Sequence, residues 1–456
     1  MTKTVRLGNG SAYWGDMLDP AVDVAAKGNI DYLGLDHLAE LTLAILQRYK
    51  QKDPKFGFIP DLLPWTEALL PITHEKGITM ITNAGGANPE EGARRVIDWA
   101  RQQGRYQGLE VGTISGDDVS GKLDDLEAQG VPFVNMDTGE EGLDRIRKDI
   151  VAANAYIGSE GILEALEAGA KYIIAGRISD GAPFVAALMH EFGWGFEDQY
   201  WDKIGAGITI GHLLECACFS TGGGSNQWKE AVDAWKIGFP IAEVNGIPEA
   251  VITKAPDTGG IVNQWTVKEQ LLYEVIDPYN YMMPDGIADL GNVTVEEIGE
   301  NRVKVKGFRG KPRPDTLKLC IGYADGWIAE GLLLFSWPDA LEKAQRAEDI
   351  VRKRLKHRVH VEPEEIRFDY IGVNALHGQT APMPETEMNE VGLRIAAKVR
   401  TREQADLVRR EATHLWTLGG VGTAFGVPFR PRPVVSLWPT LVPRDTVDIK
   451  VTVEEI

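Results

Sequence analysis

The amino-acid sequence predicts an α/β protein. We expect a parallel, helix-covered sheet of βα units in the N-terminal half, followed by a mixed α+β region with antiparallel hairpins. The first 220 residues alternate short apolar runs with helix-like segments, which is the pattern of parallel βα units. After residue 235, turns rich in Pro and Gly become frequent. We therefore expect two domains: residues 1–235, with a ligand site at the carboxyl ends of the strands, and residues 236–456, an α+β domain packed against it.

The strands expected in the first domain are short apolar runs with little alternation, which suits a sheet covered on both faces. They are Val5–Leu7, Tyr32–Leu35, Thr79–Thr82, Leu109–Val111, Pro132–Asn135 and Tyr172–Ala175. Helix-like segments lie between most of them, including Asp19–Ala26, Leu38–Gln47, Pro89–Gln103 and Gly161–Ala168.

The second region mixes hairpin and helix signals. Residues 292–306 read as two strands around the turn Gly299–Asn301, which is typical of an antiparallel hairpin. Strands are expected at Leu332–Ser336 and Leu393–Val399, and an amphipathic helix at Pro338–Leu355. Thr401 with Gln404 forms a capping-box signature for a further helix, whose apolar face is Ala405, Val408, Ala412 and Leu415.

Composition excludes several classes of function. With 48 Lys and Arg against 67 Asp and Glu, the 456-residue chain has a net charge of −19, which disfavours binding to nucleic acid. No apolar run reaches about 18 residues, so we expect no membrane span. Three cysteines, Cys216, Cys218 and Cys320, are too few for a disulfide framework and favour a reducing compartment. We expect a cytoplasmic protein.

Polar and glycine-rich turns follow the predicted strands. Ligands of open α/β sheets bind beyond the carboxyl ends of parallel strands, so we expect these turns to converge on a ligand. In chain order the turns are Gly8–Gly10, Asp36–His37, Asn83–Gly86, Thr113–Asp118, Asp137–Gly139 and Arg177–Asp180. Any α/β protein places polar residues in such turns, so it is their convergence that points to a site.

Arg177 directly follows an apolar strand and could bind a carboxylate or phosphate with two parallel hydrogen bonds. Asp180 is close enough in sequence to orient that guanidinium or to act as a base. The structural alternative is an Arg–Asp pair with a helix cap before Ala182–Met189.

His212, Glu215 and Cys216 are spaced i, i+3 and i+4, so they would share one face of a helix. This face could supply an acid–base pair, with Glu215 setting the tautomer of His212, or it could be a satisfied, half-buried helix face. Zinc is disfavoured because no second Cys pair follows. The loop Ser220–Asn226 could wrap an anion with backbone N–H groups or serve only as a hinge.

Several known motifs fail on inspection. Gly116–Lys122 nearly matches a phosphate-binding loop, but Leu123 stands where a Ser or Thr should hold magnesium. No dinucleotide fingerprint, nucleophile elbow or zinc-protease helix occurs.

A series of short motifs runs in order along the whole chain. They are Gly8-Asn9-Gly10, Trp14-Gly15-Asp16, Asp31-Tyr32-Leu33 with Asp36, Leu38-Ala39-Glu40, Asn83-Ala84-Gly85-Gly86 with Asn88-Pro89, Gly176-Arg177 with Asp180, His190-Glu191-Phe192-Gly193-Trp194, Gly211-His212 with Glu215-Cys216, Thr221-Gly222-Gly223, Thr258-Gly259-Gly260 and Gln270-Leu271-Leu272-Tyr273-Glu274. Together they resemble the acyclic terpene utilisation protein family, in a short form without the additional C-terminal ferredoxin-like domain of longer members.

The resemblance implies a role in the breakdown of branched terpenoids such as citronellol and geraniol, a route that runs through CoA thioesters. We expect an enzyme of branched-chain or terpenoid acid catabolism, a lyase or hydratase/dehydratase acting on a small carboxylate or its CoA thioester. The alternative is a non-catalytic acyl-CoA-binding or scaffolding subunit of a catabolic complex. No cofactor and no metal ligand is predicted, and a divalent metal stays open. We expect a homo-oligomer, with a small separate ferredoxin-like subunit as a candidate partner.

Arg177 would hold the carboxylate or phosphate, so we expect Arg177→Ala to abolish turnover and to leave the fold intact. Asp36, Asp180 or the His212–Glu215 pair would transfer protons. The side chains of Asn83 and Asn88 and the backbone at Gly85–Gly86 and Gly222–Gly223 would stabilise a developing oxyanion or enolate. The expected catalytic residues are Asp36, Arg177, Asp180, His212 and Glu215. The expected substrate-binding residues are Asn9, Gly10, Asp16, Asn83, Gly85, Gly86, Asn88, Thr221, Gly222 and Gly223.

Overall fold

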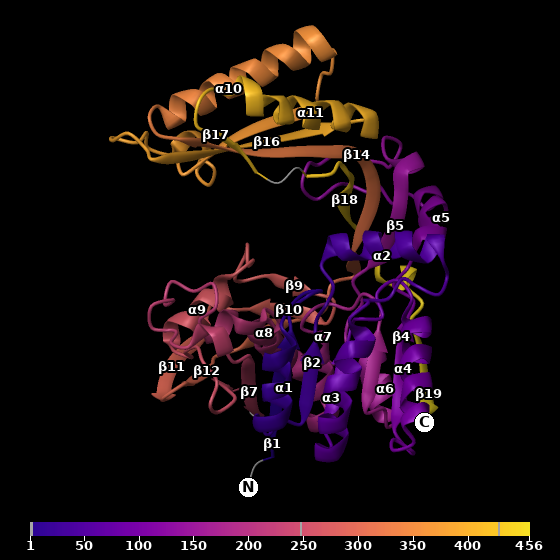
Figure 1. Ribbon diagram of the computed structural model, residues 1–456. Helices are drawn as coiled ribbons and strands as arrows, with labels where there is room; N and C mark the ends of the chain where they lie inside the picture. The colour runs from indigo at the N-terminus through magenta and orange to yellow at the C-terminus, as the bar shows by residue number, and fades with distance from the viewer. Residues whose placement is uncertain (1–2, 247–248, 427–428) are drawn as a thin grey trace. The chain divides into compact units, whose positions relative to one another are not determined.

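The structure is a computed structural model that describes residues 3–246, 249–426 and 429–456. The chain divides into two compact units (Figure 1). Unit 1 comprises Met1–Gly322 and Leu437–Ile456, and unit 2 comprises Tyr323–Ser436. Across the described ranges, no helix combines the length and the apolarity that crossing a membrane requires.

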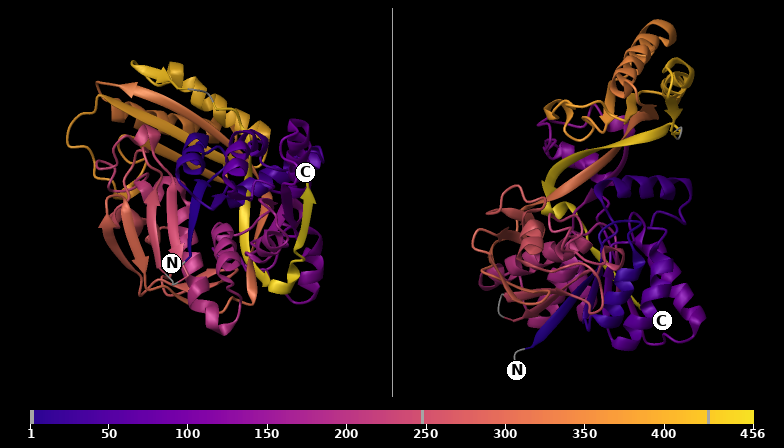
Figure 2. Two further views of the ribbon diagram at one scale, coloured as in Figure 1. Left: turned by 90° about the horizontal axis from the view of Figure 1, so that it is seen from below. Right: turned by 60° about the vertical axis from the view of Figure 1, so that its left-hand side comes forward.

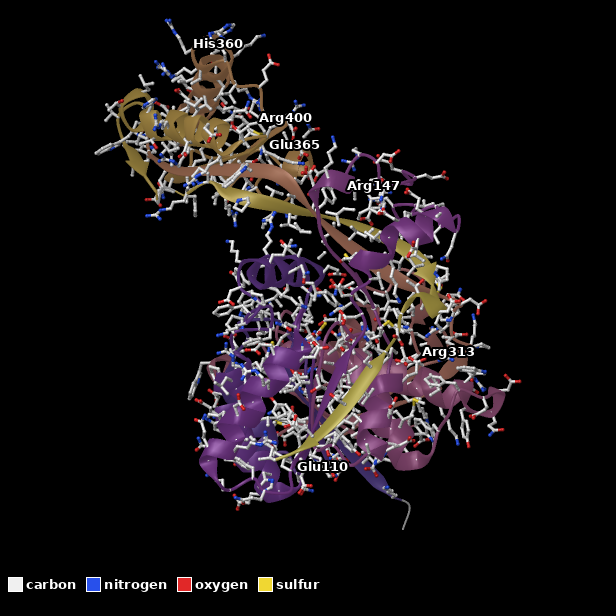
Figure 3. All side chains as sticks on the ribbon, turned by 90° about the vertical axis from the view of Figure 1, so that its right-hand side faces the viewer. Glu110, Arg147, Arg313, His360, Glu365 and Arg400 are labelled. Carbon is white, nitrogen blue, oxygen red and sulfur yellow. The ribbon has the colours of Figure 1, made fainter. Side chains whose placement is uncertain are left out.

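A ten-stranded mixed sheet forms the centre of unit 1, in the order β11-β12-β8-β7-β1-β2-β3-β6-β4-β19. The five strands from β1 to β4 in this order are parallel, and antiparallel strands flank them on both sides. β4 begins at Glu110, which Figure 3 labels, and β19 ends beside it with Glu455 opposite Glu110. The strands are β1 Thr4–Ser11, β2 Tyr32–Leu35, β3 Thr79–Thr82, β4 Glu110–Ser115, β6 Tyr172–Ala175, β7 Pro240–Asn245, β8 Glu249–Lys254, β11 Thr294–Gly299, β12 Arg302–Lys306 and β19 Lys450–Glu455.

Helices cover both faces of this sheet. One core places α6, α7 and α8 against one face, and another places α1 to α4 against the other. The helices are α1 Leu18–Lys27, α2 Glu40–Lys52, α3 Leu62–Lys76, α4 Pro89–Gln103, α5 Leu123–Ala128, α6 Glu160–Glu167, α7 Ala182–Phe192, α8 Trp201–Glu215 and α9 Gln264–Leu272. Unit 1 also contains β5 Ile150–Ala155 and a small sheet of β9 Tyr281–Met283, β10 Gly286–Asp289 and β13 Arg309–Lys311.

The predicted parallel strands are largely confirmed, with one exception. β2, β3 and β6 match their predicted bounds, but Pro132–Asn135 forms no strand. Pro132 has no N–H to donate, Phe133 has a φ of +43°, and the Asn135 side chain accepts hydrogen bonds from the N–H groups of Asp137 and Thr138. These residues form a turn, so the expected strand end at Asp137–Gly139 is absent.

The structure does not divide at residue 235. β7 and β8 follow that position but pair with β1 in the central sheet, so residue 235 lies inside unit 1. β19 returns from the C-terminus to the same sheet. The predicted parallel sheet is therefore the middle of a mixed sheet, because strands far apart in the chain complete its two edges.

Unit 2 has the βαββαβ order of ferredoxin-like folds. Its antiparallel sheet runs β15-β16-β14-β17, and α10 and α11 cover one face (Figures 1 and 2). This arrangement lies within the chain, between two segments of unit 1. The elements are β14 Thr316–Ser336, α10 Ala340–Arg354, β15 Glu365–Ile371, β16 Glu390–Val399, α11 Arg402–Leu418, β17 Thr423–Phe425 and β18 Arg432–Pro443, of which β14 and β18 also contribute residues to unit 1.

The local signals of the second region are confirmed. Thr401 and Gln404 form the predicted capping box at the start of α11, and its four predicted apolar positions are buried. The hairpin predicted at residues 292–306 is β11 paired with β12, although it belongs to the unit 1 sheet.

Candidate functional site

The carboxyl ends of β1, β2, β3 and β6 bring predicted site residues together. Asn83, after β3, accepts a hydrogen bond from the His37 N–H at 2.7 Å and donates its side-chain amide to Asp36. Asp36 also accepts from the Leu38 N–H at 3.0 Å. Asn9, in β1, donates to the backbone oxygen of Glu215 at 3.2 Å. These turns therefore lie close together in the structure, and their convergence on a ligand stays a prediction.

Arg177 is 1% exposed and is enclosed by partners of the chain itself. Its guanidinium lies 2.9 Å from the Asp180 carboxylate, donates to the Leu38 carbonyl and stacks on the ring of Tyr156, 4.0 Å from the centroid. A guanidinium held in this way neutralises the carboxylates around it. The structural Arg–Asp pair that the sequence left open is therefore present.

Gly176, directly before Arg177, packs closely against Asp117 and Gly86. A Cβ at this position would lie 2.3 Å from an oxygen of the Asp117 carboxylate and 3.2 Å from the Gly86 carbonyl oxygen. No side chain fits that space, so glycine is required here for close packing.

The start of α7 lies against the last turn of α8. A Cβ at Gly211 would lie 2.9 Å from the Gly181 Cα and 3.0 Å from its carbonyl oxygen. This approach of two glycines brings Asp180, which precedes α7, near Glu215, which ends α8. Burial raises the pKa of the Glu215 carboxyl, and the negative charge of Asp180 raises it further.

We expect Gly211→Ala to lower the free energy of unfolding by roughly 1–3 kcal/mol, because the methyl group meets backbone that must shift. Urea unfolding monitored by circular dichroism measures the loss. Gly207→Ala on the same helix is the matched control, since its Cβ would meet Val185 at an ordinary 3.6 Å. Equal stability of the two variants would contradict the close approach.

His212 and Glu215 form a buried pair on α8. The Nδ1 atom of His212 lies 2.9 Å from Glu215 Oε1 and 3.4 Å from the hydroxyl of Tyr281 in β9. His212 Nε2 and Glu215 Oε2 have no hydrogen-bond partner among the described residues. Tyr281 also lines a cavity, so its hydroxyl connects the buried His212–Glu215 pair to that cavity.

Burial and mutual contacts shift the pKa of each group. Burial lowers the pKa of His212, but the hydrogen bond to Glu215, the charges of Glu215 and Glu274 and the contact with Gln270 together outweigh it, so the pKa is raised. Burial, with the charges of Glu215 and Asp180, raises the pKa of Tyr281. Burial and Asp180 also raise the pKa of Asp36 well above its usual value, against Arg177 and Asn83. Such a cluster of shifted groups is typical of functional sites.

A cavity of about 290 Å³ opens onto this cluster. The polar part of the lining consists of Glu40, Tyr156, Ser179, Asp180, Glu274, Tyr281, Thr316 and Lys318. Its apolar part consists of Met136, Met282, Met283, Pro284, Pro314, Leu317 and Leu441. The cavity therefore combines an apolar lining with acid–base groups.

Several predicted substrate-binding residues are placed elsewhere and do not line this cavity. Asn88 donates to the carbonyls of Pro54 and Phe56, and Thr221 donates to the carbonyls of Cys218 and Gly238. Asp16 accepts from the N–H groups of Ala12 and Met17. Glycines pack tightly: added Cβ atoms at Gly10, Gly85, Gly86, Gly222 and Gly223 would all lie within 3 Å of a neighbour.

Sequence reasoning missed most of the cavity residues, among them Glu40, Tyr156, Tyr281 and Lys318. Glu40 was visible in a motif, four residues after Asp36 and at the start of α2. Tyr156 and Lys318 lie next to each other because Tyr156 N–H donates to the Lys318 carbonyl at 2.9 Å. That pairing joins segments 162 residues apart, and no local pattern signals it.

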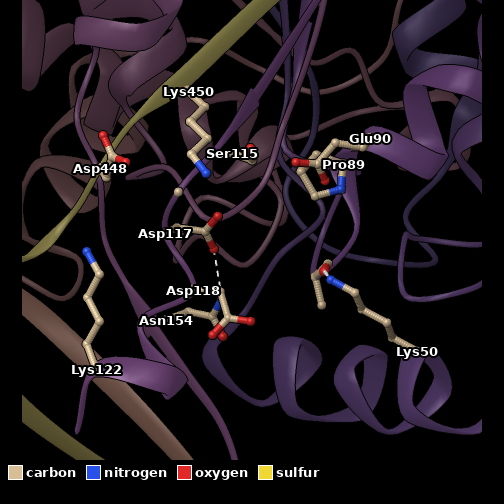
Figure 4. Close-up of a pocket in the computed structure, with 12 residues that line it drawn as sticks. Lys50, Pro89, Glu90, Ser115, Asp117, Asp118, Lys122, Asn154, Asp448 and Lys450 are labelled. Atoms are coloured by element: carbon tan, nitrogen blue, oxygen red, sulfur yellow. Dashed lines mark hydrogen bonds between the residues drawn. The ribbon is translucent and has the colours of Figure 1, made fainter. Parts of the chain in front are cut away.

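A second cavity, of about 270 Å³, lies at the carboxyl end of β4 (Figure 4). Lys50, Lys122 and Lys450 line it together with Glu90, Asp117, Asp118 and Asp448. Asp117 is buried and accepts a hydrogen bond from the Asn154 amide at 2.8 Å. Burial raises the pKa of Asp117 to about 6, although the Arg177 N–H and Asn154 oppose the shift.

Asp117 should make stability depend on pH. Its folded pKa lies above its unfolded value, so its stabilising contribution is complete below pH ~4 and is lost as pH rises through about 6. Relative to Asp117→Asn, which does not titrate, the wild type should lose roughly 3 kcal/mol between pH ~4 and ~7. Urea unfolding over that range measures the difference, with Ser115→Ala as a control in the same cavity. Parallel curves for wild type and Asp117→Asn would contradict the assignment.

The fold and site define a class: a mixed α/β protein with a buried acid–base cluster at the carboxyl ends of its parallel strands. A family model described as acyclic terpene utilisation family protein AtuA matches residues 5–453, so the chain belongs to this family, which implies a role in acyclic terpene utilisation. Searches of curated proteins and of solved structures gave no match. Within the described part of the chain, no group of three or more His, Cys, Asp or Glu side chains is placed to hold a metal ion.

Proposed function

We propose that this protein is a lyase of branched-chain or terpenoid acid catabolism, a hydratase/dehydratase acting on a small carboxylate or its CoA thioester. The observation that carries the proposal is the cavity whose apolar wall faces Asp180 and Tyr281, with the His212–Glu215 pair behind Tyr281. An apolar pocket with a few converging groups of shifted pKa is a common form of active site.

In the direction of dehydration, the Asp180 carboxylate takes a proton from the carbon next to the carboxyl group. Tyr281 gives its phenolic proton to the departing hydroxyl, so water leaves and a carbon–carbon double bond forms. Tyr281 is assigned the acid role because it lines the cavity and its hydroxyl lies 3.4 Å from His212 Nδ1, which can replace the proton that it gives up. The His212–Glu215 pair, 3.4 Å from the hydroxyl, returns a proton to Tyr281, and the partly exposed Asp180 releases the proton that it took to water, from which the pair is reprotonated. Arg177 is a positioning residue that holds Asp180.

Mass spectrometry of purified protein with branched 3-hydroxy acids and their CoA thioesters tests the proposal. Gain or loss of water supports it. Incubation in deuterated water detects the proton transfer next to the carboxyl group even where the equilibrium disfavours net conversion. Tyr281→Phe should lose dehydration while retaining part of the deuterium exchange, because Asp180 remains. Binding without conversion or exchange would instead select the acyl-CoA-binding or scaffolding subunit.

A further inference from the structure

The cavity contains a single place for an anion. Among its described lining residues, Lys318 is the one cation, whereas Glu40, Asp180 and Glu274 are acidic. Arg177 is not in the lining and is 1% exposed. Lys318 is therefore the one described lining residue whose charge attracts an anionic group that enters the cavity.

Lys318 is held in place from several sides. Its ammonium nitrogen lies 3.1 Å from Glu40 Oε1 and 4.9 Å from the centroid of the Tyr156 ring. Its side chain is still 39% exposed. An ammonium group has three N–H donors, and the contact with Glu40 occupies one, so the others can reach a ligand. Burial opposes ionisation of Glu40, but the charge of Lys318, hydrogen bonds from the Glu40 backbone and Tyr156, and the charge of Arg177 together lower the pKa of Glu40 to about 2.

The apolar residues of the lining indicate what kind of group the rest of the ligand carries. Three methionines, two prolines and two leucines provide only apolar surface, and methionine side chains adapt to irregular hydrocarbon shapes. A volume of about 290 Å³ is at the small end of ligand sites. This space suits a short branched hydrocarbon chain.

We propose that the cavity binds a free branched-chain carboxylate, with its carboxylate on Lys318 Nζ and its hydrocarbon part against the methionine wall. The assignment deepens the proposed function and rests on it, since it names the acid rather than the CoA thioester as the substrate class. It also gives Lys318 the anchoring role that the sequence predicted for Arg177.

Calorimetric binding of isovalerate and of its neutral isostere isovaleramide tests the assignment without turnover. The wild type should bind the acid more tightly than the amide. Lys318→Met should weaken isovalerate binding by about 10- to 100-fold, the effect of a lost hydrogen bond between charged groups. Isovaleramide binding should change little, and Lys318→Arg should keep the preference for the acid.

Lys306→Met, an exposed lysine on β12, is the matched control and should bind both ligands as the wild type does. A melting curve of each variant checks that it is folded. Failure of the wild type to bind isovalerate, an equal loss for acid and amide in Lys318→Met, or no loss in that variant overturns the assignment. Lys318-dependent binding without conversion or deuterium exchange overturns the proposed lyase activity and leaves the carboxylate site standing.

Discussion

Arg177→Ala is expected to destabilise the protein by about 3–5 kcal/mol, the usual effect of removing one partner of a buried ion pair. Arg177 is 1% exposed, and its guanidinium lies 2.9 Å from Asp180 and acts on Asp36 and Glu40. Without it these carboxylates face one another with no buried cation between them, and the packing on Tyr156 is lost. Urea unfolding of the purified variant measures the change.

This result would differ from the expectation, drawn from sequence, that the variant keeps its fold. The double variant Arg177→Ala/Asp180→Asn should recover part of the loss, because it removes one uncompensated charge. Arg105→Ala is the control: Arg105 is exposed and stacks on Tyr106, 5.1 Å from the ring centroid. A loss no larger than that of the control would show that Arg177 is not the electrostatic centre of the cluster.

Asp180→Asn is expected to reduce kcat by about 10²- to 10⁴-fold with little change in KM, since it removes the proposed base and keeps the shape of the cavity. Asp180 lines the cavity and its side chain is 34% exposed, so the variant should stay folded. Steady-state kinetics with a branched 3-hydroxy acid, and deuterium exchange next to its carboxyl group, give the two readouts.

Asp118→Asn provides the control for Asp180→Asn, because it removes an exposed carboxylate that lines the second cavity. Its kinetics should match those of the wild type. Full activity of Asp180→Asn would assign the base to another carboxyl group of the cluster, and Asp36→Asn is then the next variant to measure.

The sequence alone predicted the parallel core and the edge of the sheet at which the site lies. β2, β3 and β6 are short apolar runs that end in polar turns, and local composition is enough to recognise such runs. The spacing of His212 and Glu215 predicted a shared helix face. On α8 the Nδ1 atom of His212 lies 2.9 Å from Glu215 Oε1. The capping box at Thr401 was predicted for the same reason, since all its partners lie within four residues.

Tertiary structure decided what sequence patterns did not contain. β7, β8 and β19 join the central sheet through pairings with β1 and β4, which depend on register between distant segments. The same kind of long-range pairing places Lys318 beside Tyr156.

Arg177 and Lys318 also differ in how deeply each side chain is buried, which the sequence did not reveal. Both are cations near Tyr156, but Arg177 is closed off by Asp180 and the Leu38 carbonyl, whereas Lys318 lines the cavity. Residue type and spacing established which charges the chain carries at its strand ends. Only packing decided which of them is enclosed by the protein and which is partly exposed in the cavity, because solvation and distance set the energy of a charge.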